Sequence, residues 1–332
     1  MSERICITGG AGFVGRLLAR EFYNRHDVLV LDRLDFGINR FRPEELSRFE
    51  LSRTDLRDAA GVAAALDRFA PDVIVHLAAA HFIPLCERAP GSAVETNVVG
   101  TANLLMACPP NCRFVFASSG AVYAPSQALH DESRSEIGPR EVYGFTKLQG
   151  EQYVRYFAKL RGIASVVVRL FNVVGPGETN PHLLPEIVAQ MKSGHTQVAL
   201  GNLWPKRDYI HVHDAAAGFA AVALNGTVQA GETVTVNLGT AKQYSVEEMI
   251  AKLRSVSGYP LAVRHDPGRA RAVDRPFLGA VIKEIWSRFG WAPRLTVDDA
   301  IRDLWRDPDL SDDLAERLGL APSAMSLLPS CA

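Results

Sequence analysis

Two side chains with complementary chemistry lie four residues apart in a stretch that is predicted to be helical over residues 141–160. Tyr143 and Lys147 occupy positions i and i+4 of that stretch, which fall on one face of an α-helix. An ammonium group beside a phenol stabilises the phenolate and lowers its pKa from about 10. The pair is therefore predicted to accept a proton near neutral pH. Such pairs are also common on helix surfaces, so the spacing alone is weak evidence.

A serine is expected to complete this group. The apolar run at residues 113–117 predicts a strand that ends at Ser118 and Ser119. A hydroxyl at the end of a neighbouring strand can hydrogen-bond the same substrate oxygen that loses its proton. Ser119 is the predicted partner of Tyr143, and Ser118 is the alternative.

A glycine-rich turn near the N-terminus could hold a dinucleotide. Residues 4–8 form a predicted buried strand, glycines follow at three-residue spacing, and apolar residues then recur at helical spacing. Glycine lets the backbone turn tightly and approach a pyrophosphate, whose charge is bound by the N–H groups at the helix N-terminus. A plain strand–turn–helix connection is the alternative. The predicted cofactor contacts in this turn are Gly9, Gly12, Phe13, Val14 and Gly15.

The next predicted strand, residues 27–31, ends in an acid. Asp32 could accept hydrogen bonds from the ribose diol of an adenosine, and its charge would repel a 2′-phosphate. This residue favours NAD as the cofactor. Arg33 follows immediately and could instead bind a 2′-phosphate, so NADP is kept as the less favoured alternative.

The elements that must position these groups alternate regularly between strand and helix. Five such alternations without an internal repeat predict an α/β fold with a doubly wound parallel sheet. Residues 72–79 are almost continuously apolar, as a strand buried on both faces requires. The alanines at positions 78–80 leave room for a ligand beside the end of that strand.

The composition limits the classes of partner. The 332 residues carry a net charge of −1, which gives no support for nucleic-acid binding. No apolar run approaches the roughly 18 residues of a membrane helix, and the first residues lead directly into a strand, so no membrane and no secretory leader are expected. Five cysteines without paired spacing predict reduced thiols and a cytoplasmic location. No metal site is predicted from the histidine spacing.

The chain as a whole resembles the extended short-chain dehydrogenase/reductase family, and within it the nucleotide-sugar epimerases and dehydratases. The resemblance extends from residue 5 to about residue 305, and its motifs are specific for the family as a set but not for one reaction. They are TGGAGFVG at 8–15, HLAA at 76–79, SSGAVY at 118–123, YGFTK at 143–147, RLFNVVGPG at 169–177 and KRDYIHVHD at 206–214.

The resemblance assigns expected roles to residues around the cofactor. It implies a Rossmann-type domain in which Ser119, Tyr143 and Lys147 are the catalytic triad, and in which Tyr143 and Lys147 also contact the cofactor. Asn97 matches a family asparagine near the catalytic helix, and a packing or capping role is weighed equally for it. The other implied cofactor contacts are Asp55 and Leu56 beside the adenine, and Leu77, Ala78 and Ala79 of the HLAA motif.

The resemblance also implies a nucleoside-diphosphate sugar as substrate. A guanidinium group can bind a diphosphate through two parallel hydrogen bonds. Arg207 and Arg271 match the positions at which the family has arginines that bind the diphosphate, with Arg269 as an alternative to Arg271. Asn172 matches an asparagine near the same phosphates. His81 is expected to line the sugar pocket, where Ser119 and Tyr143 would contact the substrate.

The expected domain organisation follows the same pattern. Residues 1–172, with about 207–240, are predicted to form the dinucleotide-binding domain, and residues 173–206 and 241–320 a smaller C-terminal α/β substrate-binding lobe. Residues 321–332 are expected to be a loose tail. The resemblance implies a homodimer that forms through the helices at 92–107 and 141–160. Val98, Leu105, Tyr153 and Phe157 are predicted either as its apolar contacts or, equally, as core residues.

The positions after Ser119 separate the reactions that the family performs. Family 4,6-dehydratases usually have an Asp-Glu pair there, whereas this chain has Gly120 and Ala121. The favoured prediction is therefore an NAD-dependent nucleotide-sugar 4-epimerase. The alternatives are a reductase of nucleotide 4-keto sugars, less favourably a 4,6-dehydratase, and a binding protein that has lost catalysis.

Overall fold

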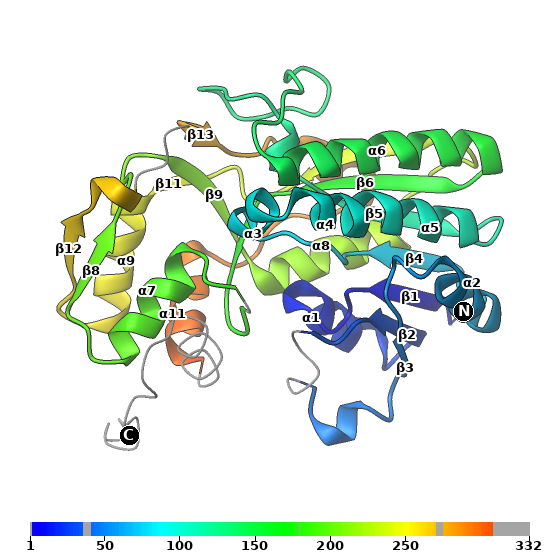
Figure 1. The fold of residues 1–332 in the computed structure, drawn as a ribbon, viewed down its shortest axis with the longest axis horizontal. Helices are drawn as coiled ribbons and strands as arrows, with labels where there is room; N and C mark the ends of the chain where they lie inside the picture. Colours follow the sequence, from blue (N-terminus) through cyan, green and yellow to red (C-terminus); the bar gives the residue numbers. More distant parts are fainter. Residues whose placement is uncertain (1, 36–40, 179, 270–274, 308–332) are drawn as a thin grey trace.

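The computed structural model describes residues 2–35, 41–178, 180–269 and 275–307 (Figure 1). These residues form one large domain around a parallel sheet and a smaller lobe, which lies on the left in Figure 1. Within the described residues, no helix has both the length and the apolarity needed to cross a membrane. The four cysteines in this part of the chain are buried free thiols.

The large domain is built on seven parallel strands in the order β10-β6-β5-β4-β1-β2-β3. The order reverses beside β1, which confirms the predicted doubly wound sheet. In such sheets, ligands bind outside the carboxyl ends of the strands at the point of reversal. The strands are β1 (Arg4–Thr8), β2 (Asp27–Asp32), β3 (Glu50–Arg53), β4 (Val73–His76), β5 (Arg113–Ser119), β6 (Ala164–Leu170) and β10 (Thr233–Leu238).

Helices cover both faces of this sheet. Successive residues of β1 point into separate cores, with Ile5 and Ile7 in one and Cys6 in the other. Burial on both faces explains why the strands are almost continuously apolar. One face carries α1 (Phe13–Phe22), α8 (Val212–Leu224) and α10 (Lys283–Phe289), and the other carries α2 (Ala59–Phe69), α5 (Gly100–Ala107) and α6 (Val142–Arg161).

The helix predicted over residues 92–107 is longer and less regular than expected. Helix α4 (Pro90–Val94) leads into a π-helical turn at Glu95–Val99, which continues directly into α5. A π-helical turn contains one residue more than the α-helix would need. Asn97 is buried at the middle of this turn. The short helix α3 (Ile83–Arg88) precedes α4.

The smaller lobe has its own hydrophobic core. Strand β9, which begins near the predicted boundary at residue 207, pairs with strands of the lobe. The chain returns to the large sheet only after it, through α8 and β10. The position of the domain boundary therefore stays a prediction. The lobe contains a four-stranded sheet of β7 (Asn172–Val174), β9 (Lys206–His211), β11 (Gln243–Ser245) and β13 (Phe277–Leu278), a two-stranded sheet of β8 (Gln197–Leu200) and β12 (Ala262–His265), and helices α7 (Leu183–Lys192), α9 (Val246–Ser257) and α11 (Val297–Arg306).

Helix α6 packs closely on strand β5 and on the turn that follows it, because two of its glycines face them. A Cβ atom on Gly150 would be 2.5 Å from Cζ of Phe116, and a Cβ atom on Gly144 would be 2.7 Å from the carbonyl oxygen of Ala121. Neither separation is tolerated between real atoms. The glycines therefore set the distance between the helix and the strand end.

We predict that Gly150→Ala lowers the free energy of unfolding by about 1 kcal/mol or more. Overpacking of a core costs about 1–3 kcal/mol, which outweighs the gain of up to about 1 kcal/mol from better helix propensity. Urea denaturation of both proteins measures the difference. Gly91→Ala is the matched control, since a Cβ there has no neighbour within 4 Å and should leave the stability unchanged or slightly higher. Equal stability of the Gly150→Ala variant and the parent would contradict the packing.

Candidate active site

The predicted catalytic group comes together at the carboxyl end of β5. Tyr143 and Lys147 lie on the first turns of α6, and the hydroxyl of Ser119 hydrogen-bonds the Tyr143 side chain. Lys147 Nζ donates to the carbonyl oxygen of Ala117 at 2.7 Å and lies 5.8 Å from the centre of the Tyr143 ring. The phenol of Tyr143, the hydroxyl of Ser119 and the amine of Lys147 thus lie close together, as proton exchange with a single substrate oxygen requires.

Burial, rather than the neighbouring amine, dominates the ionisation of this group. It raises the pKa of Tyr143 above its ordinary value, against the opposing effect of the Ser119 hydrogen bond. It also lowers the pKa of Lys147 to about 7. The prediction that Lys147 lowers the pKa of Tyr143 is therefore wrong for the protein alone, because desolvation removes much of the lysine charge on which that prediction depended.

The structure distinguishes the two candidate serines. Ser118 Oγ donates to Glu151 Oε1 at 2.6 Å in a buried network, where Arg169 also binds Glu151 through two hydrogen bonds of 2.9 and 2.8 Å. Successive residues of a strand point to opposite faces, so Ser119 points to the Tyr143 side. Ser118 has a structural partner, and Ser119 is the one placed for chemistry.

Asn97 ties the strand-end loop to the catalytic helix. Its amide oxygen accepts from Ala80 N at 2.8 Å, and its amide nitrogen donates to Ala80 O and to Thr146 Oγ1, each at 2.9 Å. Thr146 in turn donates to the carbonyl oxygen of Tyr143 at 2.8 Å. These contacts favour the packing alternative for Asn97 over direct cofactor binding.

Arg275 is a supporting residue that the sequence did not reveal. Its buried guanidinium donates to the carbonyl oxygens of Tyr123 at 2.6 Å and Ala121 at 2.9 Å, and it pairs with Glu141 at 3.1 Å. It therefore fixes the turn after Ser119 against the start of α6. The contacts join residues more than 130 positions apart, so no local spacing could have indicated them.

The glycine turn has the shape that a dinucleotide pyrophosphate requires. Gly9 has a φ of +69°, and a Cβ atom there would be 2.7 Å from Ala78 N. A Cβ atom on Gly15 would be 2.2 Å from the carbonyl oxygen of Gly9. Helix α1 begins after Gly12, which offers no capping side chain, so the N–H groups of Phe13, Val14 and Gly15 are those that an anion at this helix end would bind.

The carboxylates beyond β2 fit a ribose with a free 2′-hydroxyl. Asp32 accepts hydrogen bonds from Ala11 N at 3.0 Å and Leu34 N at 2.8 Å, and its oxygens have capacity for further donors. Arg33 pairs with Asp35 and, at 3.5 Å, with Asp55. The arginine charge is thus already matched by acids, which supports NAD over NADP.

The remaining predicted cofactor residues surround the same edge of the sheet. Asp55 is bound by Arg57 at 2.6 Å, which lowers the pKa of Asp55 to about 2. Leu56 is buried in the core against Gly100. Leu77, Ala78 and Ala79 follow β4 directly, and Leu77 N donates to Thr8 O at 3.1 Å, beside the glycine turn.

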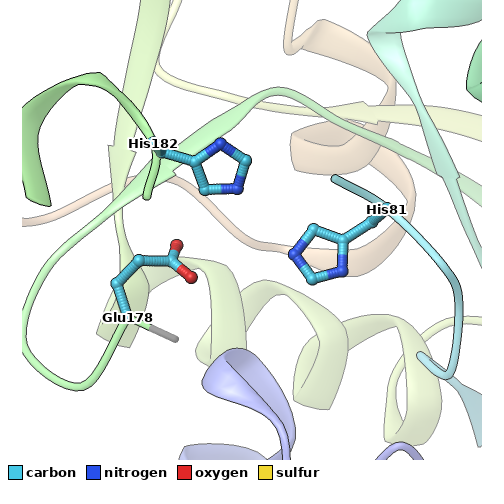
Figure 2. Close-up of side chains that lie close together, drawn as sticks. All are labelled: His81, Glu178 and His182. Atoms are coloured by element: carbon cyan, nitrogen blue, oxygen red, sulfur yellow. The ribbon is translucent and has the colours of Figure 1, made fainter. Parts of the chain in front are cut away.

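The predicted substrate residues are spread over both parts of the molecule. His81 lies in the segment after β4, where it faces Glu178 and His182 (Figure 2). Asn172 is exposed at the start of β7. Arg207 lies on β9 and donates to the carbonyl oxygens of Lys206 at 2.9 Å and Arg275 at 2.8 Å. Arg271 and the side chain of Arg269 lie outside the described residues.

The fold and the site together define a Rossmann-type protein that carries a Ser–Tyr–Lys group beside its dinucleotide turn. The model of the NAD-dependent epimerase/dehydratase family matches residues 5–239. The chain belongs to this family.

Individual relatives match over almost their whole lengths. The UDP-glucose 4-epimerase of Corynebacterium glutamicum is 29% identical over 91% of this chain and 94% of its own. The GDP-6-deoxy-D-mannose reductase of Pseudomonas aeruginosa is 24% identical over 92% of this chain and 97% of its own. The crystal structure of the Thermus thermophilus UDP-glucose 4-epimerase complex with NAD superposes with a TM-score of 0.80 at 26% identity, and covers 91% of this chain and 97% of its own.

We predict that the buried lysine makes stability depend on pH. Between about pH 7 and the ordinary lysine pKa of 10.5, the unfolded chain binds a proton that the folded chain does not, so this lysine makes the free energy of unfolding rise with pH. The free energy of unfolding of the parent, minus that of Lys147→Met, should therefore rise from pH 7 to pH 10. Urea denaturation of dinucleotide-free protein measures it. Lys159→Met, on the exposed side of α6, is the control; the same pH slope for both variants would refute the assignment.

Proposed function

We propose that this protein is an NAD-dependent epimerase that inverts C4 of the sugar in a nucleoside-diphosphate sugar. The reaction passes through a transient 4-keto sugar and involves no net change in oxidation state. The names of its relatives support this proposal, because they include UDP-glucose 4-epimerases and one epimerase in complex with NAD. The nucleotide base and the sugar are left open.

The observation that carries the proposal is the turn after Ser119, which has a proton-transfer group beside it but carries no acidic side chain and is tightly packed. A Cβ atom on Gly120 would be 3.0 Å from Cε1 of Phe171, and Ala121 is buried. The Asp-Glu pair of the family dehydratases is therefore absent from these positions and could not be placed there without repacking. Tyr143 alone supports oxidation and re-reduction of a hydroxyl-bearing carbon, not elimination of water.

The residues of this chain have defined parts in that reaction. Tyr143 accepts the proton of the sugar 4-hydroxyl, and Ser119 holds the same oxygen by a hydrogen bond. Lys147, anchored on Ala117 O, lies beside the phenol and is proposed to bind the ribose next to the nicotinamide. The keto sugar then rotates within the pocket so that its opposite face meets the cofactor, while its diphosphate stays bound. Arg207 and Asn172 are proposed to bind the phosphates.

The cofactor site fits NAD by its shape and charge. Gly9 and Gly15 allow the backbone to approach a pyrophosphate, and Asp32 is proposed to accept from the ribose hydroxyls. A bound nicotinamide dinucleotide would supply the hydride acceptor and the positive charge of its oxidised ring. Because a nearby cation favours the ionised phenol, we infer that the pKa of Tyr143 is lower in the loaded enzyme than burial alone makes it.

A 4-keto-sugar reductase is the second candidate, because one relative is a reductase. The two functions differ in how they use the cofactor. An epimerase recycles its NAD in place, whereas a reductase exchanges its cofactor at every turnover. Denaturation of the purified protein and identification of the released dinucleotide by mass separates them. Near-stoichiometric NAD supports the epimerase, and an empty site that fills only with added NADPH supports the reductase.

We predict that Tyr143→Phe lowers the epimerisation rate by at least about 100-fold, the usual contribution of a positioned acid–base group. Interconversion of UDP-glucose and UDP-galactose, followed by a coupled dehydrogenase assay, is the first measurement. The amount of bound dinucleotide should be unchanged, since only the hydroxyl is removed. Tyr153→Phe, exposed on the same helix, is the control and should keep full activity. An active Tyr143→Phe variant would rule out the assignment.

We also propose that the protein is a homodimer that pairs through the outer face of helices α4, α5 and α6. Of the four residues predicted as either dimer contacts or core, Val98 and Leu105 are buried in the core, while Tyr153 is exposed and Phe157 partly buried. An exposed apolar face of this kind is typical of protein–protein interfaces. Its exposed apolar residues are Val94, Val99, Met106, Tyr153, Tyr156 and Leu160.

We predict that the double substitution Tyr156→Arg and Leu160→Arg produces a monomer. Both side chains are about three-fifths exposed in the single chain, at 60% and 62%, so charges there should repel a partner without disturbing the core. Sedimentation velocity measures the mass. Trp286→Arg, exposed to 61% on α10, is the control and should remain a dimer. A monomeric parent, or a dimeric double variant, would contradict the proposed interface.

A further inference from the structure

Two imidazoles and one carboxylate meet between the large domain and the lobe. His81 comes from the segment after β4, whereas Glu178 and His182 come from the connection between β7 and α7. One ligand atom from each lies within 4.8 Å of the others. Figure 2 shows the two rings and the carboxylate pointing toward a common centre.

The ring of His81 is held in an orientation suited to binding. It hydrogen-bonds the backbone carbonyl of Ala79, and its Nε2 atom faces the cluster, 3.1 Å from Nδ2 of Asn180. An imidazole whose second nitrogen is fixed by a backbone carbonyl presents its other nitrogen in the orientation usual for a metal-binding histidine.

The carboxylate carries the negative charge of the cluster. Glu178 is only 3% exposed, and Asn180 N donates to its Oε1 at 3.0 Å. Its carboxylate faces both imidazoles (Figure 2) and so adds a charged oxygen ligand to the two nitrogen ligands.

We propose that His81, Glu178 and His182 bind one divalent transition-metal ion, with Zn²⁺ the best match. Two imidazole nitrogens and one carboxylate oxygen are a donor set that Zn²⁺ uses with a fourth position left open. Donors on one tetrahedral Zn²⁺ lie about 3.3 Å apart, given metal–ligand distances of about 2.0–2.1 Å. The three side chains therefore close on the ion by small rotations of their χ angles.

The side chain of Asn180 lies where it could provide the fourth ligand of the ion. A half-turn of its amide exchanges nitrogen and oxygen, and this brings the oxygen to the position that now faces His81 Nε2. A water molecule or a sugar hydroxyl is the other group that the open position accepts. The backbone N–H of Asn180 and the Ala79 carbonyl complete the support around the ligands.

The ion would link the two parts of the molecule at the edge of the catalytic site. His81 follows Ala80, which Asn97 holds against the catalytic helix α6, whereas His182 immediately precedes helix α7 of the lobe. A metal bound by both segments fixes the lobe relative to the Ser119–Tyr143 pair. The proposal stands independently of the epimerase function, because it concerns only binding and stability.

Metal analysis of the full chain, prepared without a polyhistidine tag, tests the proposal. The protein is loaded with Zn²⁺ or Co²⁺, desalted and analysed by mass spectrometry of the metal. We expect close to one ion per chain, a visible absorption spectrum typical of Co²⁺ with four or five ligands, and a higher melting temperature with Zn²⁺. His81→Ala, Glu178→Gln and His182→Ala should each weaken binding at least about tenfold and abolish the thermal shift.

His195→Ala removes an exposed histidine in the turn after α7 and should bind metal like the parent. Glu178→Gln keeps the shape of the side chain, and circular dichroism verifies that each variant is folded. Binding well below one ion per chain, or unchanged binding in all three variants, overturns the proposal. Absence of metal binding combined with a raised KM in the same variants would show that the cluster contacts the sugar directly, which also overturns it.

Discussion

The close contact between helix α6 and strand β5 is the constraint on which the site depends. Gly144 and Gly150 bring the helix so near the sheet that the amine of Lys147 reaches the backbone of β5 and loses its hydration. The same approach sets Tyr143 beside the end of the strand. Burial thus disfavours the charged forms of both the amine and the phenol. The position of the group and its ionisation therefore depend on the same packing distance.

Much of the fold and the central chemistry could be predicted from the sequence, because both are encoded locally. Continuous apolar runs bounded by glycines predicted the parallel strands, and the four-residue spacing of Tyr143 and Lys147 placed them on one helix face. Ser118 could not be excluded as the alternative to Ser119 in this way, since the face that each presents depends on where the strand begins. The direction of the Tyr143 pKa was predicted wrongly, because spacing contains no information about burial.

The supporting residues could not be predicted, because their contacts join distant parts of the chain. Arg275 reaches the turn after Ser119 across more than 150 residues, and Asn97 joins Ala80 to Thr146 by hydrogen bonds that only the folded sheet creates. His81 and His182, the two histidines of the proposed metal site, lie 101 positions apart in the sequence, so a search for ligands by spacing would also miss them. Each of these sets becomes visible only when the order of the strands is known.

The π-helical turn at Glu95–Val99 shows how such contacts limit the evolution of chain length. This turn accommodates one residue more than a regular α-helix, and Asn97 at its centre serves both the strand-end loop and the catalytic helix. Deleting one residue would regularise the helix and leave the buried face of α5 where it is, because the turn absorbs its extra residue locally. The change would fall on Asn97, whose amide contacts both Ala80 and Thr146 from within the turn. The irregular turn thus confines the consequence of one extra residue to the contacts that this residue makes.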